Sequence, residues 1–190
     1  MPEWLKQLLI MQGSLGFVDT LKTLTNTDPK FINMPSVVRS QGNRLGAFGL
    51  EGDDSFIGLA QAPITQNFDQ TSGYRGYGKE VPFNPKLGDY ILGHEFGHAA
   101  TLGKNKNLSK ELENVEGGTD PTNENFADLF QQSVQFLRDP KADLSKLNEK
   151  QAIITNILLQ QPIYAAHPIN QRRMLEQFLM GQQSNRPEKK

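Results

Sequence analysis

The amino-acid sequence predicts an α+β fold that is mostly helical and contains a small sheet. Apolar residues recur at helical spacing in several long segments. One shorter region, 47–60, has two apolar pieces around a Gly-Asp-Asp turn, which is typical of a β-hairpin. The 190 residues include no cysteine, so a hydrophobic core must stabilise the chain without disulfides. This length suits a single domain, 1–190.

The first half of the chain contains one predicted helix and the predicted sheet. An amphipathic helix is expected over residues 2–24, with a weak point at Gly13 and Gly16. A short strand is expected at 36–39. The second half of the 47–60 hairpin gives a strand near 55–60. Residues 61–84, rich in Gly, Gln, Asn and Tyr, are expected to form a long loop of the kind that often carries function.

Four helices are predicted in the second half of the chain. The first begins at Asn84-Pro85 or Asp89 and ends at 102, before Gly103, and a polar linker covers 104–119. The second begins at Asp120-Pro121 and ends before Asp139-Pro140. The third covers 143–160 and the last 168–180, with Gly181 beyond it. We therefore expect an N-terminal helix or arm at 1–24, a core at 43–180 and a flexible tail at 184–190.

The charge balance excludes one large class of function. Lys and Arg number 20 and Asp and Glu number 21, so the net charge is −1 and an ordinary basic nucleic-acid binder is not expected. No apolar run reaches the ~18–20 residues of a membrane span, and the N-terminus lacks the features of a secretory signal. We expect a cytoplasmic, delivered or particle-associated protein without a membrane anchor.

The strongest chemical signal is His94-Glu95-Phe96-Gly97-His98 in the predicted helix that ends at residue 102. Residues four apart leave the same face of a helix, so both imidazoles can bind one tetrahedral metal ion. Glu95 lies beside the first histidine, where it can reach a metal-bound water. The surrounding residues are apolar, which predicts a buried helix in which the polar side chains need a partner. The alternative is a hydrogen-bonded pair of core histidines.

A third protein ligand is expected in the next helix. Lys104 stands where the metzincin motif has a histidine, which excludes that class. Glu124 and Asp128 are again four residues apart and share a helix face, so Glu124 can bind the metal while Asp128 accepts a ring N–H from His94 or His98. The alternative is the solvated face of an amphipathic helix, which Gln131 and Gln135 would continue.

The third histidine, His167, precedes Pro168 at the start of the last predicted helix. Held there, its ring could point into a cleft and donate a hydrogen bond to an oxyanion. It could equally serve as a helix cap. Its position in the sequence leaves both interpretations open.

Three motifs, in this order, resemble those of gluzincin metallopeptidases of the HtpX and CAAX-prenyl-protease type. They are HExGH at 94–98, ExxAD at 124–128 and HPxxxxR[I/M] at 167–174. A weaker similarity places residues 47–59 at the turn and edge strand of that family. The resemblance covers about 43–179 and implies a minimal, divergent zincin-like fold in which an edge strand of the small sheet borders the active-site cleft.

The resemblance also implies roles for individual residues. His94, His98 and Glu124 would bind Zn²⁺, Glu95 would act as general base and then acid, and Asp128 would orient a ligand. His167 would steady the tetrahedral intermediate or approach the metal, and Arg173 would brace the site by pairing with Asp128 or Glu124. An extended peptide would add to the edge strand formed by Ser55, Phe56, Ile57, Gly58 and Leu59.

The expected function is therefore that of a zinc-dependent endopeptidase acting on a peptide or protein substrate. One alternative is a binding or structural protein on the same fold, with zinc but little peptidase activity, for example a phage virion component. Another is a zinc hydrolase that does not cleave peptides. The Asn- and Gln-rich composition suits a component of a larger assembly.

Overall fold

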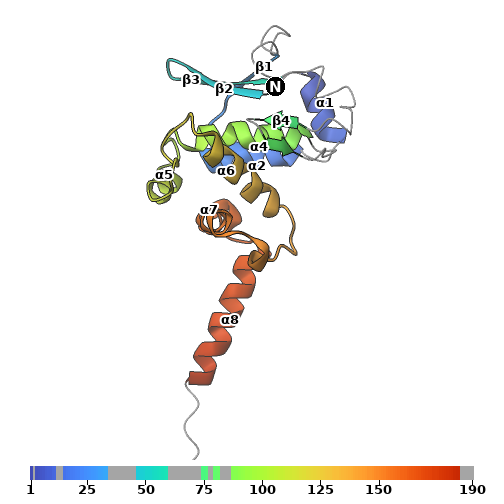
Figure 1. Cartoon of the computed structure of the whole chain (residues 1–190). Helices are drawn as coiled ribbons and strands as arrows, with labels where there is room; N and C mark the ends of the chain where they lie inside the picture. The colour runs from blue at the N-terminus through green and yellow to red at the C-terminus, as the bar shows by residue number, and fades with distance from the viewer. Residues whose placement is uncertain are drawn as a thin grey trace, which may run out of the picture.

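The computed structural model describes residues 1, 3–11, 15–33, 46–59, 74–76, 79–81 and 87–184. Within these ranges the fold is mostly helical with a small mixed sheet, which confirms the predicted α+β class. Figure 1 shows the elements stacked in layers, with the sheet at one end and the helix α8 projecting from the other. Among the described residues, none of the helices combines the length and hydropathy that a membrane span requires.

Three strands form the sheet, in the order β1-β3-β2. The strands β2 (Gly46–Glu51) and β3 (Asp54–Leu59) form the predicted antiparallel hairpin, and Gly52 supplies a left-handed φ of 61° at its turn. The strand β1 (Lys30–Asn33) runs parallel to β3 on the opposite side from β2. The strand β1 was not predicted from the sequence, and the strand expected at 36–39 lies outside the described residues.

Part of the predicted 61–84 loop is a second small sheet. The strands β4 (Tyr74–Gly76) and β5 (Lys79–Val81) pair in antiparallel fashion. The loop prediction is therefore wrong at these six positions, and the remaining positions of 61–84 lie outside the described residues.

The helix α4 (Leu87–Ala100) lies at the centre of the fold. It contacts α2 (Leu15–Thr25), the strand β2 and the helix α6 (Glu124–Phe136), and α6 in turn contacts α7 (Glu149–Leu159). Because α4 has neighbours on several sides, its apolar residues are buried nearly all round, as the sequence predicted. Phe96, Phe126 and Phe130 are among the largest fully buried side chains of this core.

Several helix boundaries differ from the prediction. Two helices, α1 (Glu3–Met11) and α2, replace the single helix expected over 2–24. The helix α6 begins at Glu124 and not at Asp120-Pro121, because the Asn123 side chain caps it while Asp120 closes its own turn with Thr122. The predicted linker contains α5 (Lys106–Leu112).

The last two predicted helices also change. The segment expected as one helix over 143–160 splits into a short 3₁₀ turn, Leu144–Lys146, and α7, which Asn148 and Gln151 cap reciprocally. The helix α8 (Pro168–Ser184) follows another 3₁₀ turn, Pro162–Tyr164, and continues through Gly181, which was expected to terminate it. Of the predicted tail, 185–190 lies outside the described residues.

Candidate metal centre

Two glycines bring α4 and α6 unusually close together. A Cβ at Gly97 would lie 2.8 Å from the Cα and 3.0 Å from the carbonyl oxygen of Ala127, and a Cβ at Gly93 would lie 3.1 Å from Gln131 Cγ. Gly93 and Gly97 are four residues apart, as are Ala127 and Gln131, so each pair forms a narrow stripe along its helix. This close approach places Glu124 and Asp128, on the adjoining face of α6, against the histidines of α4.

The Gly97→Ala substitution tests this close approach. Because the new methyl group would meet backbone atoms of α6, the helices must separate. We expect the free energy of unfolding to fall by about 1–3 kcal/mol. Metal affinity should fall at least ~10-fold as Glu124 moves away. Gly16→Ala in α2 is the matched control, because a Cβ there meets nothing within 4 Å. Denaturant unfolding and metal titration of both variants check this expectation, and an unchanged metal affinity in Gly97→Ala would contradict it.

Three ligand atoms of the predicted type converge between α4 and α6. His94 Nε2 lies 2.9 Å from Glu124 Oε2 and 3.2 Å from His98 Nε2, and His98 Nε2 lies 3.6 Å from Glu124 Oε2. The three residues can hold a metal ion. The histidines are largely buried, whereas the Glu124 side chain stays 29% exposed, so the group is reached from solvent on the side of α6.

A second carboxylate fixes the orientation of the His94 ring. His94 Nδ1 lies 2.9 Å from Asp128 Oδ1, and the tautomer that donates Nδ1–H to this carboxylate leaves Nε2 with its lone pair toward Glu124. Tyr90, one turn before His94 on α4, also donates to Asp128 over 3.4 Å. The residue spacing predicted the Asp128 contact but not that of Tyr90, although Tyr90 and His94 are four residues apart.

The charges around His94 shift its titration. Burial alone would lower the pKa of His94, but the hydrogen bonds to Asp128 and Glu124, together with the charge of Glu95, outweigh it and raise the pKa to about 9. A cation on this ring is thus strongly stabilised. The same acidic surroundings favour a metal cation that replaces the proton.

The ring of His98 is held mainly by packing. It stacks on Phe48 of β2, with ring centroids 6.5 Å apart and an interplanar angle of 22°. Its buried Nδ1 has no hydrogen-bond partner in the part of the chain that the structure describes. His98 therefore differs from His94, whose Nδ1 is anchored by a carboxylate.

Glu95 lies on the β2 side of α4 and is almost completely buried. Burial raises the pKa of Glu95 to about 7, although His94, His98 and a hydrogen bond from the Phe48 backbone N–H each act to lower it. The strand approaches so closely that a Cβ at Gly46 would collide with Glu95 Oε1. A carboxyl group with this pKa can both accept and donate a proton near neutral pH.

The strand that borders the site is β2, the first half of the hairpin, and not the second half as predicted from the sequence. Ser55, Phe56, Ile57, Gly58 and Leu59 were expected to form an edge strand, but they belong to β3, which pairs with β2 on one side and with β1 on the other. Its backbone therefore cannot accept an added strand along most of its length. Within the described residues, β2 forms the edge of the sheet nearest α4.

The structure places His167 far from the three ligands. His167 Nε2 donates to the carbonyl oxygen of Leu137 over 3.0 Å, and Nδ1 accepts from the backbone N–H of Ile169 over 3.3 Å. Leu137 follows the last residue of α6, roughly 20 Å along the helix axis from Glu124. The expectation that His167 faces the metal is therefore wrong, and its helix-cap interpretation agrees with both contacts.

His167→Ala should therefore act on stability. We expect the free energy of unfolding to fall by about 0.5–2 kcal/mol, the usual range for a lost helix cap, with metal content unchanged. Denaturant unfolding and metal analysis of the same preparation check this expectation. If metal binding weakened while the unfolding free energy stayed the same, the assignment of His167 as a cap would be overturned.

Arg173 does not brace the metal centre either. Its guanidinium donates to Asn156 Oδ1 of α7 over 2.8 Å, so it joins α8 to α7. The predicted pairing with Asp128 or Glu124 is wrong. The helix α8 begins beside the C-terminal end of α6, where His167 contacts Leu137, whereas Glu124 and Asp128 lie in the N-terminal half of α6.

No family model matches this chain, and no curated protein or solved structure shows significant similarity to it. The chemistry of the site therefore follows from its own geometry. Two imidazoles and one carboxylate converge from α4 and α6, a second carboxylate orients one imidazole, and a buried glutamate with a pKa near neutrality lies beside them.

Proposed function

We propose that this protein is a zinc-dependent endopeptidase of the gluzincin type. The observation that carries the proposal is the triangle of His94 Nε2, His98 Nε2 and Glu124 Oε2, with sides of 2.9, 3.2 and 3.6 Å. Ligand atoms around a tetrahedral zinc ion are separated by about 3.3–3.4 Å, given the usual Zn–N and Zn–O lengths of ~2.0–2.1 Å. Two histidines and one carboxylate are also a common ligand set of catalytic zinc.

The proposed chemistry assigns one task to each neighbouring residue. His94, His98 and Glu124 would hold the zinc ion, which would supply Lewis-acid chemistry toward a carbonyl group and a water molecule. Glu95 accepts the proton of the attacking water and delivers it to the nitrogen of the leaving amine. Asp128 holds His94 in the tautomer that presents Nε2. Phe48 orients Glu95 through its backbone N–H and packs on the ring of His98.

The edge of β2 is the proposed peptide-binding element. A peptide in extended conformation can pair with a free sheet edge through backbone hydrogen bonds. The contact between β2 and α4 would hold such a peptide beside Glu95 and the histidines. The edge-strand role expected for residues 55–59 is thus proposed for β2.

Incubation with a mixed-peptide library, read by mass spectrometry, tests the proposal. The full chain should generate new peptide termini, and a zinc chelator should stop their formation. The Glu95→Gln protein, purified identically, controls for contaminating peptidases. The absence of cleavage by a zinc-containing preparation, or equal cleavage by Glu95→Gln, would contradict the proposal.

A second function is favoured by the projecting helix α8. Met174 and Leu175 are each 58% exposed and Met180 is 64% exposed, so α8 presents apolar side chains to solvent. Contact with another protein would cover these side chains, as in a zinc-binding component of a larger assembly. Zinc binding without any peptide cleavage would favour this function over the first.

A further inference from the structure

A groove of about 740 Å³ lies next to the metal centre, between α6 and the beginning of α7. The segment that joins α5 to α6 forms its third wall. This volume is in the range of protein sites that bind small ligands or peptide side chains. The groove belongs to neither the ligand triangle nor the sheet edge described above.

The groove is connected to the metal centre through α6. Asp128 lines the groove and also hydrogen-bonds to His94. Glu124, Asp128 and Gln132 follow one another at intervals of four residues, so a single stripe of α6 leads from the metal ligand into the groove. Each interval spans about 6 Å, which an extended peptide covers with about two residues.

The interior of the groove offers apolar surface. Ile153 on α7 is 47% exposed, although its neighbour Ile154 is fully buried. Half-buried Val115 and Leu129 line the groove as well. These three side chains form an exposed apolar surface. Its burial under an aliphatic side chain of a ligand would be favourable.

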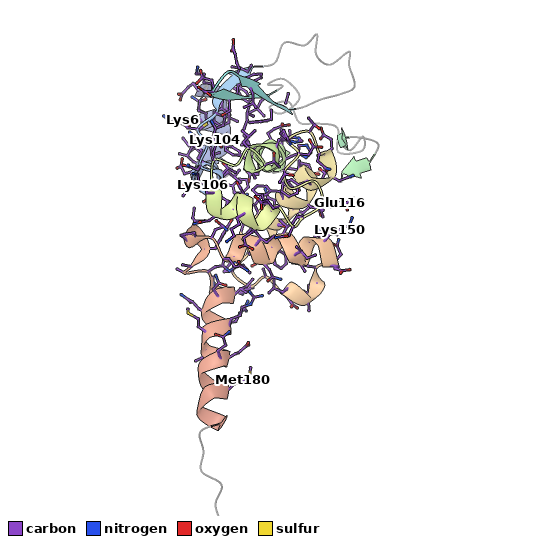
Figure 2. The ribbon with its side chains drawn as sticks, turned by 90° about the vertical axis from the view of Figure 1, so that its left-hand side faces the viewer. Lys6, Lys104, Lys106, Glu116, Lys150 and Met180 are labelled. Carbon is purple, nitrogen blue, oxygen red and sulfur yellow. The ribbon has the colours of Figure 1, made fainter. Side chains whose placement is uncertain are left out.

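The polar groups of the groove suit a peptide that has no acidic side chains. Asn114 and Asn125 supply amide groups that both donate and accept, as the backbone of a peptide requires. At the rim, Lys150 forms an ion pair with Glu116 over 3.3 Å. Figure 2 shows these two residues next to each other at the edge of the molecule. Their charges compensate each other, whereas the carboxylates of Asp128 and Glu149 also line the groove and repel an acidic ligand.

We propose that this groove binds the part of a peptide substrate that flanks the bond to be cleaved, and that it selects a segment with an aliphatic side chain and without acidic residues. The inference rests on the proposed peptidase function. A peptide held at the metal centre would follow the stripe of α6 from Glu124 into the groove, so the substrate itself is the expected occupant. The aliphatic side chain would contact Val115, Leu129 and Ile153, and the peptide backbone would meet the asparagine amides.

The test measures binding separately from hydrolysis. The Glu95→Gln protein is titrated with the octapeptide acetyl-Ala-Gln-Ala-Leu-Leu-Ala-Gln-Ala-amide and with a version in which aspartate replaces both leucines. Backbone ¹H–¹⁵N spectra report the binding. We expect the leucine peptide to shift the amide signals of Val115, Leu129 and Ile153, and to bind at least ~10-fold more tightly than the aspartate peptide.

A variant that fills the groove sharpens the test. Ile153→Trp should weaken binding of the leucine peptide about 10-fold, while Leu175→Trp, at an exposed apolar position of α8, should leave it unchanged. Because Ile153 is exposed, the variant is expected to fold, and its spectrum verifies this. Unaltered binding in Ile153→Trp, or no shifts at the groove with either peptide, would overturn the inference.

Two other outcomes separate the groove from the activity. Groove binding in a wild-type protein that cleaves no peptide would contradict the peptidase proposal and leave the binding site standing. Cleavage that Ile153→Trp does not alter would contradict the groove alone. Concentration-dependent shifts at the groove without peptide would identify a second copy of the chain as the occupant and overturn the inference.

Discussion

Glu124→Gln is expected to lower zinc affinity more than 100-fold and to remove peptide hydrolysis with it. The amide is nearly isosteric with the carboxylate, so the helix should remain, but the negative charge that lies 2.9 Å from His94 Nε2 is lost. Loss of an outer partner of a metal ligand typically costs 10–100-fold in affinity, and a direct ligand should cost more. Zinc titration with a competing chelator measures the effect.

Glu149→Gln provides a matched control for this variant. Glu149 is the first residue of α7 and follows the capping Asn148, just as Glu124 is the first residue of α6 and follows the capping Asn123. Both substitutions therefore remove the same favourable interaction with a helix N-terminus. Only Glu124→Gln should change zinc affinity; equal losses in both variants would show that Glu124 acts through helix stability.

Glu95→Gln is expected to keep zinc and fold while slowing hydrolysis about 10²–10⁴-fold. This is the usual contribution of a general acid–base group. Glu95 is assigned to proton transfer because it is buried against β2, with a pKa raised to about 7, and it does not belong to the converging ligand triangle. Rates on a cleaved library peptide and zinc content of the same preparation measure both effects. Loss of zinc would instead identify Glu95 as a ligand.

The candidate metal centre could be predicted from sequence because its geometry depends largely on helix periodicity. The pairs His94/His98 and Glu124/Asp128 are each four residues apart, so each pair shares a helix face wherever the two helices lie. The feature that joins them, the close approach of Gly97 to Ala127, is also visible as two small residues within these motifs. The sequence does not specify that these two positions meet, and the structure supplies that contact.

The remaining site predictions failed where they depended on long-range arrangement. The apolar residues of 55–59 indicated a strand, but their burial reflects a central position between β1 and β2, which no local pattern distinguishes from an edge. His167 and Arg173 were assigned from a motif resemblance. The order of motifs along the chain does not specify at which end of α6 the helix α8 begins.

Local competition between capping residues explains the main boundary errors. Asp120-Pro121 and Asn123 are both acceptable helix starts, and the choice of Asn123 shortened α6 by three residues. The short helix α5 was missed because only Leu108 and Leu112 carry its buried face in an otherwise polar segment.

The zinc content of the purified chain tests the central claim most directly. Protein prepared without added zinc, washed free of loosely bound ions and analysed by elemental mass spectrometry should contain one zinc per chain. The Glu124→Gln protein, prepared in parallel, should contain almost none. Wild-type protein that contains no zinc, and that neither binds added zinc nor gains thermal stability from it, would contradict the assignment of His94, His98 and Glu124 as a metal centre.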